Sequence, residues 1–371
     1  MPGPLEGVRV IELARILAGP WAGQTLADLG AEVIKVESPE GDDTRRWGPP
    51  FIARADGSQD AAYFHSTNRG KASVTADFRT PEGQERVRAL VADADVLIEN
   101  FKLGGLAKYG LDYDSLSALN PRLVYCSITG FGQTGPYAHR AGYDYIIQGM
   151  SGLMSVTGPA DGAPHKVGVA VTDIVTGIYA STAILAALHE RARSGLGQHI
   201  DMALMDSAVA LMANQAMNYL ATGDAPKRLG NFHPNLAPYQ TVPCADGHII
   251  IATGNDGQYQ RLCELLDLTD LVAHPDFATN AARVRNRDAL SDRISAATRH
   301  WESATLLAAC ERAGVPAGPI RDMDAVFADP QVQARDLMLD MDGLKGVRAP
   351  FRFSRHPLAQ GRPAPMLGED D

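Results

Sequence analysis

The sequence lacks the short motifs on which several common chemistries depend. Its four cysteines form no CxxC pair, which argues against a zinc site or a disulfide framework and favours a reducing compartment; they are Cys126, Cys244, Cys263 and Cys310. The ten histidines show no HExxH spacing, and no GxSxG nucleophile elbow is present. We therefore expect no metal cofactor and no serine-hydrolase chemistry.

An excess of basic residues is also missing. The chain of 371 residues carries 34 Lys and Arg against 44 Asp and Glu, a formal net charge of −10. Binding to nucleic acid or to an anionic membrane depends on a net basic surface that displaces counterions, so neither is expected as a partner. An anionic ligand would need a local basic patch.

No apolar run is long and pure enough to suggest a membrane span. The longest, residues 169–188, is interrupted by Asp173 and by several Thr, Ser and Gly residues. An Asp at the middle of a bilayer costs about 3 kcal/mol, so we predict a buried helix instead. The N-terminal residues run directly into a strand-like segment, and we expect neither a targeting peptide nor a location outside the cytoplasm.

What the sequence does contain is an alternation of strand and helix patterns. Residues 7–14 and 31–37 read as strands on either side of a helix at 19–30 that is rich in small residues. Further strand patterns follow at 71–78, 95–101 and 122–132, with a helix over 80–94 that begins at Thr80 and Pro81. This rhythm predicts an α/β fold with a mostly parallel sheet covered by helices.

The domain organisation follows from changes of character along the chain. Residues 140–225 are helical and rich in small residues, and a loop-like stretch at 226–242 leads into strand and helix patterns of a smaller α+β unit. The Pro-rich C-terminal tail is expected to pack on the first domain. We therefore predict a large domain of residues 1–225 completed by 326–371, and a small domain of residues 226–325.

The βαβ opening raises a dinucleotide-binding alternative, because Glu37 ends the second strand where a ribose-binding acid would stand. The glycines that such a site needs are missing, since the only pattern after the first strand is Gly19-x-x-x-Gly23. This spacing is explained more simply by a helix that packs closely on the sheet. A dehydrogenase remains an alternative that nicotinamide binding would reveal.

Basic residues gather in the N-terminal half, several of them at predicted strand ends. Open α/β sheets bind ligands at those ends, so the cations could neutralise the phosphates of a nucleotide-like ligand, or they could form an ordinary solvated surface. The candidates are Arg45, Arg46, Arg69, Lys71, Lys102, Lys108 and Arg140.

Asp173 is the carboxylate that stands out, because it lies at the start of the apolar helix. One interpretation is a helix N-terminal acid favoured by the helix dipole, with Thr172 as the cap. The other is a nucleophile, because a carboxylate that is ionised at pH 7 can attack an acyl carbon without an adjacent base. The loop at 252–258 places Gly254 and Gly257 after a strand, where backbone N–H groups could approach a ligand or simply form a turn.

Taken together, several segments of the sequence resemble those of the class III CoA-transferases, and the resemblance covers nearly the whole chain. The matching pieces include LEGVRVIEL, LAGPWAGQTLADLGAEVIKVESPEGDDTRRWGPP, NRGK, DVLIENF, LVYCSITGFGQTGPYAHRAGYD, GVAVTDIVTG, GLGQHIDMAL and GVPAGPI. The residues of the segments GDDTRRWGPP and YCSITGFGQTGP resemble the succinyl-CoA:dicarboxylate branch more closely than the formyl-CoA branch. The resemblance implies a Rossmann-like large domain, a smaller domain and a homodimer of two chains interlocked as rings.

The resemblance also implies roles for individual residues. Asp173 matches the nucleophile, so that an acyl-aspartyl anhydride and then an aspartyl-CoA thioester would form on it. The CoA-binding positions that it implies are Leu17, Ala18, Asn68, Arg69, Gly70, Lys71, Asn100, Phe101, Lys102, Lys108, Arg140 and Tyr143. Residues Gly254, Asn255 and Gly257 match a substrate loop that we expect to close over the intermediate and exclude water.

Two departures from the family pattern bear on function. Ser38 stands where the formyl-CoA branch has an Arg that binds the nucleotide, which leaves Arg45 or Arg46 as candidates to replace it. Acyl-CoA racemases share this fold but carry a His where this chain has Tyr143, and Tyr is poorly suited to acid–base work near neutral pH. We therefore expect CoA transfer from an acyl-CoA such as succinyl-CoA to a carboxylic or dicarboxylic acid. A racemase or epimerase and a non-catalytic acyl-CoA-binding protein are the alternatives.

Overall fold

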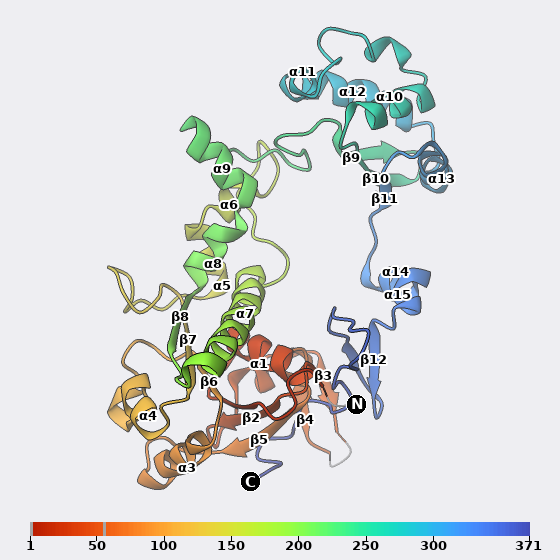
Figure 1. Cartoon of the computed structure of the whole chain (residues 1–371). Helices are drawn as coiled ribbons and strands as arrows, with labels where there is room; N and C mark the ends of the chain where they lie inside the picture. Colours follow the sequence, from red (N-terminus) through yellow and green to blue (C-terminus); the bar gives the residue numbers. More distant parts are fainter. Residues whose placement is uncertain (1–2, 55–56) are drawn as a thin grey trace. The chain divides into compact units, whose positions relative to one another are not determined.

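The computed structural model describes residues 3–54 and 57–371, which form two compact units (Figure 1). Unit 1 comprises Met1–Leu153, Val167–Ala213 and Pro330–Asp371, and unit 2 comprises Met154–Lys166 and Asn214–Asp329. These bounds differ from the expected ones, because residues 154–166, 214–225 and 326–329 belong to the smaller unit. The chain thus enters unit 2 early, returns to unit 1 for residues 167–213, which form two helices and the last strand of the sheet, and then leaves again.

Unit 1 is built on a six-stranded sheet in which every neighbouring pair is parallel. Its strands in chain order are β1 (Arg9–Glu12), β2 (Glu32–Glu37), β5 (Lys71–Thr75), β6 (Val96–Glu99), β7 (Val124–Thr129) and β8 (His199–Ala203). In space they follow the order β5-β2-β1-β6-β7-β8, so the third strand of the sheet in chain order lies at one edge and the first lies inside. This is the Rossmann order, and the predicted parallel α/β sheet is confirmed.

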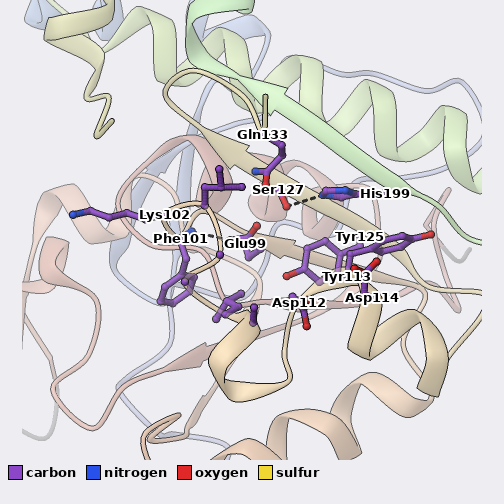
Figure 2. A pocket seen from close by; sticks show the side chains of 15 residues that line it. Glu99, Phe101, Lys102, Asp112, Tyr113, Asp114, Tyr125, Ser127, Gln133 and His199 are labelled. Atoms are coloured by element: carbon purple, nitrogen blue, oxygen red, sulfur yellow. Dashed lines mark hydrogen bonds between the residues drawn. The ribbon is translucent and has the colours of Figure 1, made fainter. Parts of the chain in front are cut away.

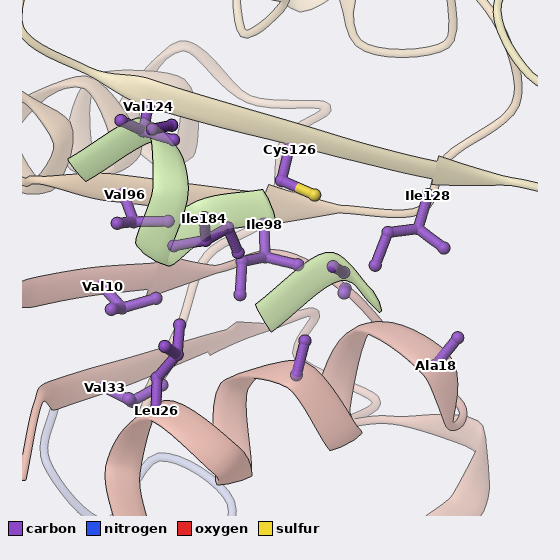
Figure 3. Close-up of a cluster of buried hydrophobic side chains, with 14 of the residues drawn as sticks. Val10, Ala18, Leu26, Val33, Val96, Ile98, Val124, Cys126, Ile128 and Ile184 are labelled. Carbon is purple, nitrogen blue, oxygen red and sulfur yellow. The ribbon is translucent and has the colours of Figure 1, made fainter. Parts of the chain in front are cut away.

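Helices cover both faces of this sheet because successive strand residues point to opposite sides. One face packs against α1 (Ala18–Asp28), α7 (Val171–Ser194) and α8 (Leu204–Leu211), and its core includes Val10, Ile98 and Ile184 (Figure 3). The other face packs against α3 (Pro81–Ala92) and α4 (Tyr113–Leu119), with alternate residues such as Ile11 and Leu97 in its core. The two cores fix the carboxyl ends of β1 and β6 rigidly in place.

The remaining elements of unit 1 are short. They comprise α2 (Ala62–His65), α5 (Asp144–Met150), the 3₁₀ helices η1 (Asp43–Arg46) and η2 (Ala107–Tyr109), the hairpins β3 (Phe51–Ala53) with β4 (Gln59–Ala61) and β12 (Met338–Met341) with β13 (Leu344–Val347), and α15 (Pro330–Ala334). The C-terminal tail lies against the edge strand β5, where the Ser73 and Thr75 amides donate to the carboxylates of Asp370 and Asp371. The tail therefore completes unit 1.

The Gly19-x-x-x-Gly23 spacing of α1 has a packing explanation. A Cβ at Gly19 would lie 2.3 Å from the Cβ of Ala14, and one at Gly23 would lie 1.8 Å from Oε2 of Glu12. Both contacts are far shorter than real Cβ contacts, so the glycines let α1 approach the sheet. The structure thus supports close packing as the reason for the spacing.

The long apolar helix α7 is a core element of unit 1. By length and composition it could cross a membrane. One of its faces, however, packs on α1, where a Cβ at Gly177 would lie 2.7 Å from the carbonyl oxygen of Ala18. Its buried face also carries Thr172, Thr176 and Arg191, and Arg191 pairs with Asp95 at 2.6 Å. We therefore describe α7 as a helix that packs one face on the core of unit 1.

Unit 2 is a small α+β body with an antiparallel sheet. The strands β9 (Tyr239–Cys244), β10 (Gly247–Ala252) and β11 (Ala317–Pro319) follow the order β11-β10-β9. Its helical elements are α9 (Ala213–Thr222), α10 (Asp256–Leu265), η3 (Thr269–Leu271), α11 (Asn280–Arg285), α12 (Arg287–Thr298), α13 (Ser303–Ala313) and α14 (Met323–Ala328), and α6 (Leu153–Val156) joins it to unit 1. Its separate core includes Ile249, Leu262 and Leu306.

Candidate functional site

A cavity of about 430 Å³ opens in unit 1 where the strand order reverses, outside the carboxyl ends of β1 and β6. This is the place where open α/β sheets bind ligands. Residues after β1, β6 and β7 line it together with the start of α7, which contributes Asp173. We call it the Asp173 cavity.

The loops after β1 and β6 are joined across the strand-order reversal. The backbone N–H of Arg15 donates to Oδ1 of Asn100 at 2.9 Å, and Nδ2 of Asn100 donates to the carbonyl of Arg15 at 2.6 Å. The next residue, Ile16, has a φ of 73°, which is strained for a β-branched side chain, and its N–H donates to the carboxylate of Asp42. Such strain persists only where surrounding contacts impose it, so this corner of the cavity is fixed in advance of ligand binding.

Cations without acidic partners line the Asp173 cavity. Lys102, Lys108 and Arg140 all border it, and none of the three makes an ion pair among the residues that the structure describes. The guanidinium of Arg140 lies over the ring of Tyr137, 4.6 Å from its centroid, and the ammonium of Lys108 lies 4.7 Å from that of Tyr109. Unpaired cations in a concave site attract an anionic ligand such as a phosphate ester.

Asp173 occupies the first turn of α7, and its carboxylate has no hydrogen bond or ion pair within the described ranges. Burial raises the pKa of Asp173 to about 7, and the charge of Asp144 adds to the increase. Burial therefore works against the full ionisation at pH 7 that the sequence led us to expect for this group. A carboxylate of this basicity is a stronger nucleophile than an exposed one.

Asp144 on α5 holds the start of α7. Its Oδ1 accepts the backbone N–H of Thr172 at 2.9 Å and the Thr172 hydroxyl at 2.6 Å, and its Oδ2 accepts Nε2 of Gln148. The suggestion that Thr172 caps the helix is thus wrong, because the Thr172 hydroxyl faces Asp144 and a residue from another helix satisfies the free N–H. This arrangement fixes the position of the neighbouring Asp173.

The structure brings together nine of the residues predicted from the sequence. They all line the Asp173 cavity: Leu17, Ala18, Asn100, Phe101, Lys102, Lys108, Arg140, Tyr143 and Asp173. Two further residues were missed. Arg15 also lines it, and its position directly after β1 was the available signal. The other is Tyr63 on α2: burial raises its pKa to about 12, and the nearby charges of Asp173 and Asp144 add to the increase.

Other predicted residues hold the fold and do not line the Asp173 cavity. Arg45 is buried between Glu37 and Asp60, at 2.6 and 3.0 Å, and Arg69 pairs with Asp28 at 2.5 Å. The ammonium of Lys71 contacts Glu12 and Oδ1 of Asn68, and the N–H of Gly70 donates to the carbonyl of Arg362. Arg46 is exposed and donates to the carbonyl of Glu40. These partners explain why none of these residues presents a free charge to the cavity.

The predicted substrate loop lies in unit 2 and forms a capped helix start. Oδ1 of Asn255 accepts the N–H of Gln258 at 2.9 Å, and the N–H of Gly254 donates to Oε1 of Gln258 at 2.7 Å. Asp256 pairs with the buried Arg283. The role of Gly254, Asn255 and Gly257 over a bound intermediate stays a prediction.

The described residues contain no group of three or more His, Cys, Asp and Glu side chains arranged to hold a metal ion. The four cysteines, all of them within the described ranges, are buried free thiols. The chemistry that the Asp173 cavity offers is therefore that of a basic carboxylate beside unpaired cations.

Comparison with known proteins connects this arrangement to one family. The sequence profile of CoA-transferase family III matches residues 5–371. The chain is 61% identical to succinate–glutarate CoA-transferase of Agrobacterium fabrum, over 99% of this chain and 93% of that one, and 42% identical to human succinyl-CoA:glutarate CoA-transferase, over 99% and 84%.

Solved structures agree in fold. A CAIB/BAIF family protein from Brucella suis superposes with a TM-score of 0.90 at 61% identity, covering 100% of this chain and 97% of that one. The Rv3272 protein of Mycobacterium tuberculosis does so with a TM-score of 0.88 at 32% identity, covering 99% and 98%.

Proposed function

The chain belongs to CoA-transferase family III, and from that premise we propose that it transfers CoA from succinyl-CoA to a dicarboxylate, with glutarate as the preferred acceptor. The observation that carries the proposal is the basic carboxylate of Asp173 in a cavity that also presents unpaired cations. Relatives named for glutarate, mesaconate and citramalate as acceptors support a dicarboxylate.

The proposed reaction passes through Asp173 in four balanced steps. A carboxylate oxygen of Asp173 attacks the thioester carbonyl, the C–S bond breaks, and a succinyl-aspartyl anhydride and CoA thiolate form. The thiolate attacks the aspartyl carbonyl and releases succinate, leaving an aspartyl-CoA thioester. The acceptor carboxylate then displaces CoA to form a second anhydride, and the thiolate finally attacks the acceptor acyl carbon, which frees Asp173.

Cations and helix α7 assist this chemistry in different ways. Lys102, Lys108 and Arg140 are suited to the phosphates of CoA, which keeps the thiolate near Asp173 between steps. The N-terminal end of α7 favours the negative charge that returns to Asp173 when it leaves the anhydride. Once Asp173 is ionised, none of the four steps transfers a proton.

The covalent intermediate provides the decisive test. Protein incubated with succinyl-CoA, treated with hydroxylamine or borohydride and mapped by peptide mass spectrometry is expected to be modified at Asp173. An unmodified Asp173 in protein that still binds CoA would overturn the proposed route. It would favour a racemase or a non-catalytic acyl-CoA-binding protein, and exchange of labelled succinate into succinyl-CoA separates these because a binding protein cannot catalyse it.

The pH dependence of the reaction follows from the environment of Asp173. With a pKa of about 7, its carboxyl group is protonated and unreactive at lower pH, so kcat/KM for succinyl-CoA should rise as pH increases through 7. Replacing Asp144 with Asn removes a negative charge that raises this pKa, and the midpoint should move to lower pH. Initial rates from pH 5.5 to 8.5 check both. A midpoint that does not respond to the Asp144 substitution would assign the titration to another group.

We further propose that the protein acts as a homodimer. Unit 1 exposes apolar side chains on three helices of one core layer, namely Tyr145 and Ile146 on α5, Ile178 and Tyr179 on α7, and Val209 on α8. Exposed apolar surface of this kind is typical of association between subunits. Light scattering coupled to size-exclusion chromatography should give about twice the chain mass of 39.6 kDa.

A further inference from the structure

A second cavity, of about 260 Å³, lies beside the loop that follows β6 (Figure 2). We call it the Glu99 cavity. It shares Phe101, Lys102, Leu103 and Gly105 with the lining of the Asp173 cavity. The segment from Phe101 to Gly105 is therefore a wall between the two cavities, and of its side chains the Phe101 ring packs against the core that includes Ile11 and Leu97.

Hydrogen bonds hold the backbone of this wall. The N–H of Phe101 donates to Oε2 of Glu99 at 2.7 Å. Glu99 also accepts a hydrogen bond from the hydroxyl of Ser127, and Oγ of Ser127 lies 2.9 Å from Nε2 of His199. The ring of His199 stacks on Tyr113 with an interplanar angle of 16°. Figure 2 shows this chain of contacts running from β8 across β7 to the loop after β6.

Glu99 differs from the other buried acids of unit 1. Glu12, Glu37 and Asp28 each pair with a lysine or an arginine. Glu99 is only 5% exposed, yet no ion pair involves it in the part of the chain that the structure describes. Burial raises the pKa of Glu99 to about 7, against the lowering effect of Ser127 and the Phe101 N–H. A buried carboxyl group without a cation is destabilising, which favours a reason for it other than stability.

We propose that Glu99 is a positioning residue for CoA binding: by holding the Phe101 amide, it fixes the wall that carries Lys102 into the Asp173 cavity. This inference rests on the proposed function, because it assumes that CoA occupies that cavity. The hydrogen-bond partners of Glu99 among the described residues are Phe101 and Ser127 and do not include Asp173, so Glu99 acts on the affinity for CoA and leaves the chemical steps alone.

Kinetics of variants separate this role from a merely structural one. We expect Glu99→Ala to raise the KM for succinyl-CoA by about tenfold while kcat falls less than about threefold, since one charge-assisted hydrogen bond is lost. Glu99→Gln keeps a carbonyl oxygen for the Phe101 N–H and should restore the KM to near that of the wild type. Gln133 lines the Glu99 cavity, and its backbone N–H donates to Asp201, so Gln133→Ala is the matched control with an unchanged KM. A lower kcat at unchanged KM in Glu99→Ala would overturn the proposal.

Two measurements that do not depend on catalysis test the role of Glu99 separately from the proposed function. Hydrogen exchange at the Phe101 amide of substrate-free protein should accelerate at least about tenfold in Glu99→Ala and stay slow in Glu99→Gln. The affinity for CoA, measured by calorimetry, should fall in Glu99→Ala and recover in Glu99→Gln. A wild-type protein that transfers no CoA would overturn the proposed function, whereas equal exchange rates and equal affinities would overturn the role of Glu99.

Discussion

Replacing Asp173 with Asn is expected to abolish CoA transfer, lowering kcat/KM for succinyl-CoA by about 10⁴-fold or more. Asn has nearly the same shape, so the cavity should keep its form and its affinity for CoA. An amide, however, cannot form the anhydride that the proposed route requires. Initial rates of glutaryl-CoA formation, together with calorimetric titration of CoA, check both parts of this expectation.

The same substitution should stabilise the protein, which a structural residue would not do. An unfolded Asp ionises near pH 3.8, but Asp173 in the folded chain ionises near 7. Between these values the folded state binds more protons than the unfolded state, so the stability contributed by this group falls as pH rises through that window and stays low above it. The Asp173→Asn variant does not lose this stability. At pH 8 the melting temperature of the variant should therefore exceed that of the wild type. Residual transfer with a lowered melting temperature would contradict the role of Asp173.

The placement of residues along the sheet could largely be predicted from sequence. Alternating patterns identified β1, β2, β6 and β7, because strands buried on both faces form short apolar runs bounded by turns. Side chains that directly follow such strands must gather at one edge of a parallel sheet. Lys102 therefore fell on the Asp173 cavity as expected, and Arg15 would have done so by the same rule, whereas Asn100 was expected there only from the family resemblance.

The pairing of charges could not be predicted in this way. Arg45 and Arg69 looked as available as Arg140, but their acidic partners lie 8 and 41 residues away, on elements that only the fold brings together. The boundary between the two units could not be predicted for the same reason. Residues 154–166 carry no local sign that they join the distant segment 214–329, because that association depends on tertiary contacts.

Breaking the buried charge cluster around Glu12 is expected to have the largest effect on stability. The ammonium groups of Lys35 and Lys71 lie 3.1 and 2.8 Å from the Glu12 carboxylate, and all three side chains are fully buried. Removing the shared acid leaves Lys71 without an anionic partner, because only Lys35 keeps Asp42, at 3.0 Å. An uncompensated buried charge destabilises by about 3–5 kcal/mol, so Glu12→Gln should lower the free energy of unfolding by that amount.

Urea denaturation of the full chain measures this change, and an exposed pair supplies the control. Arg88 and Glu85 lie 3.0 Å apart on the surface of α3, and Glu85→Gln should change the free energy of unfolding by less than about 1 kcal/mol. If Glu12→Gln had an equally small effect, the ammonium of Lys71, whose pKa burial already lowers to about 8, would be losing its proton in the variant. Lys71→Met in the Glu12→Gln background distinguishes these cases, because it removes the stranded ammonium and should recover much of the lost stability. Glu12 also fills the space against α1 that Gly23 leaves open, so the charge cluster and the glycine spacing of α1 depend on each other.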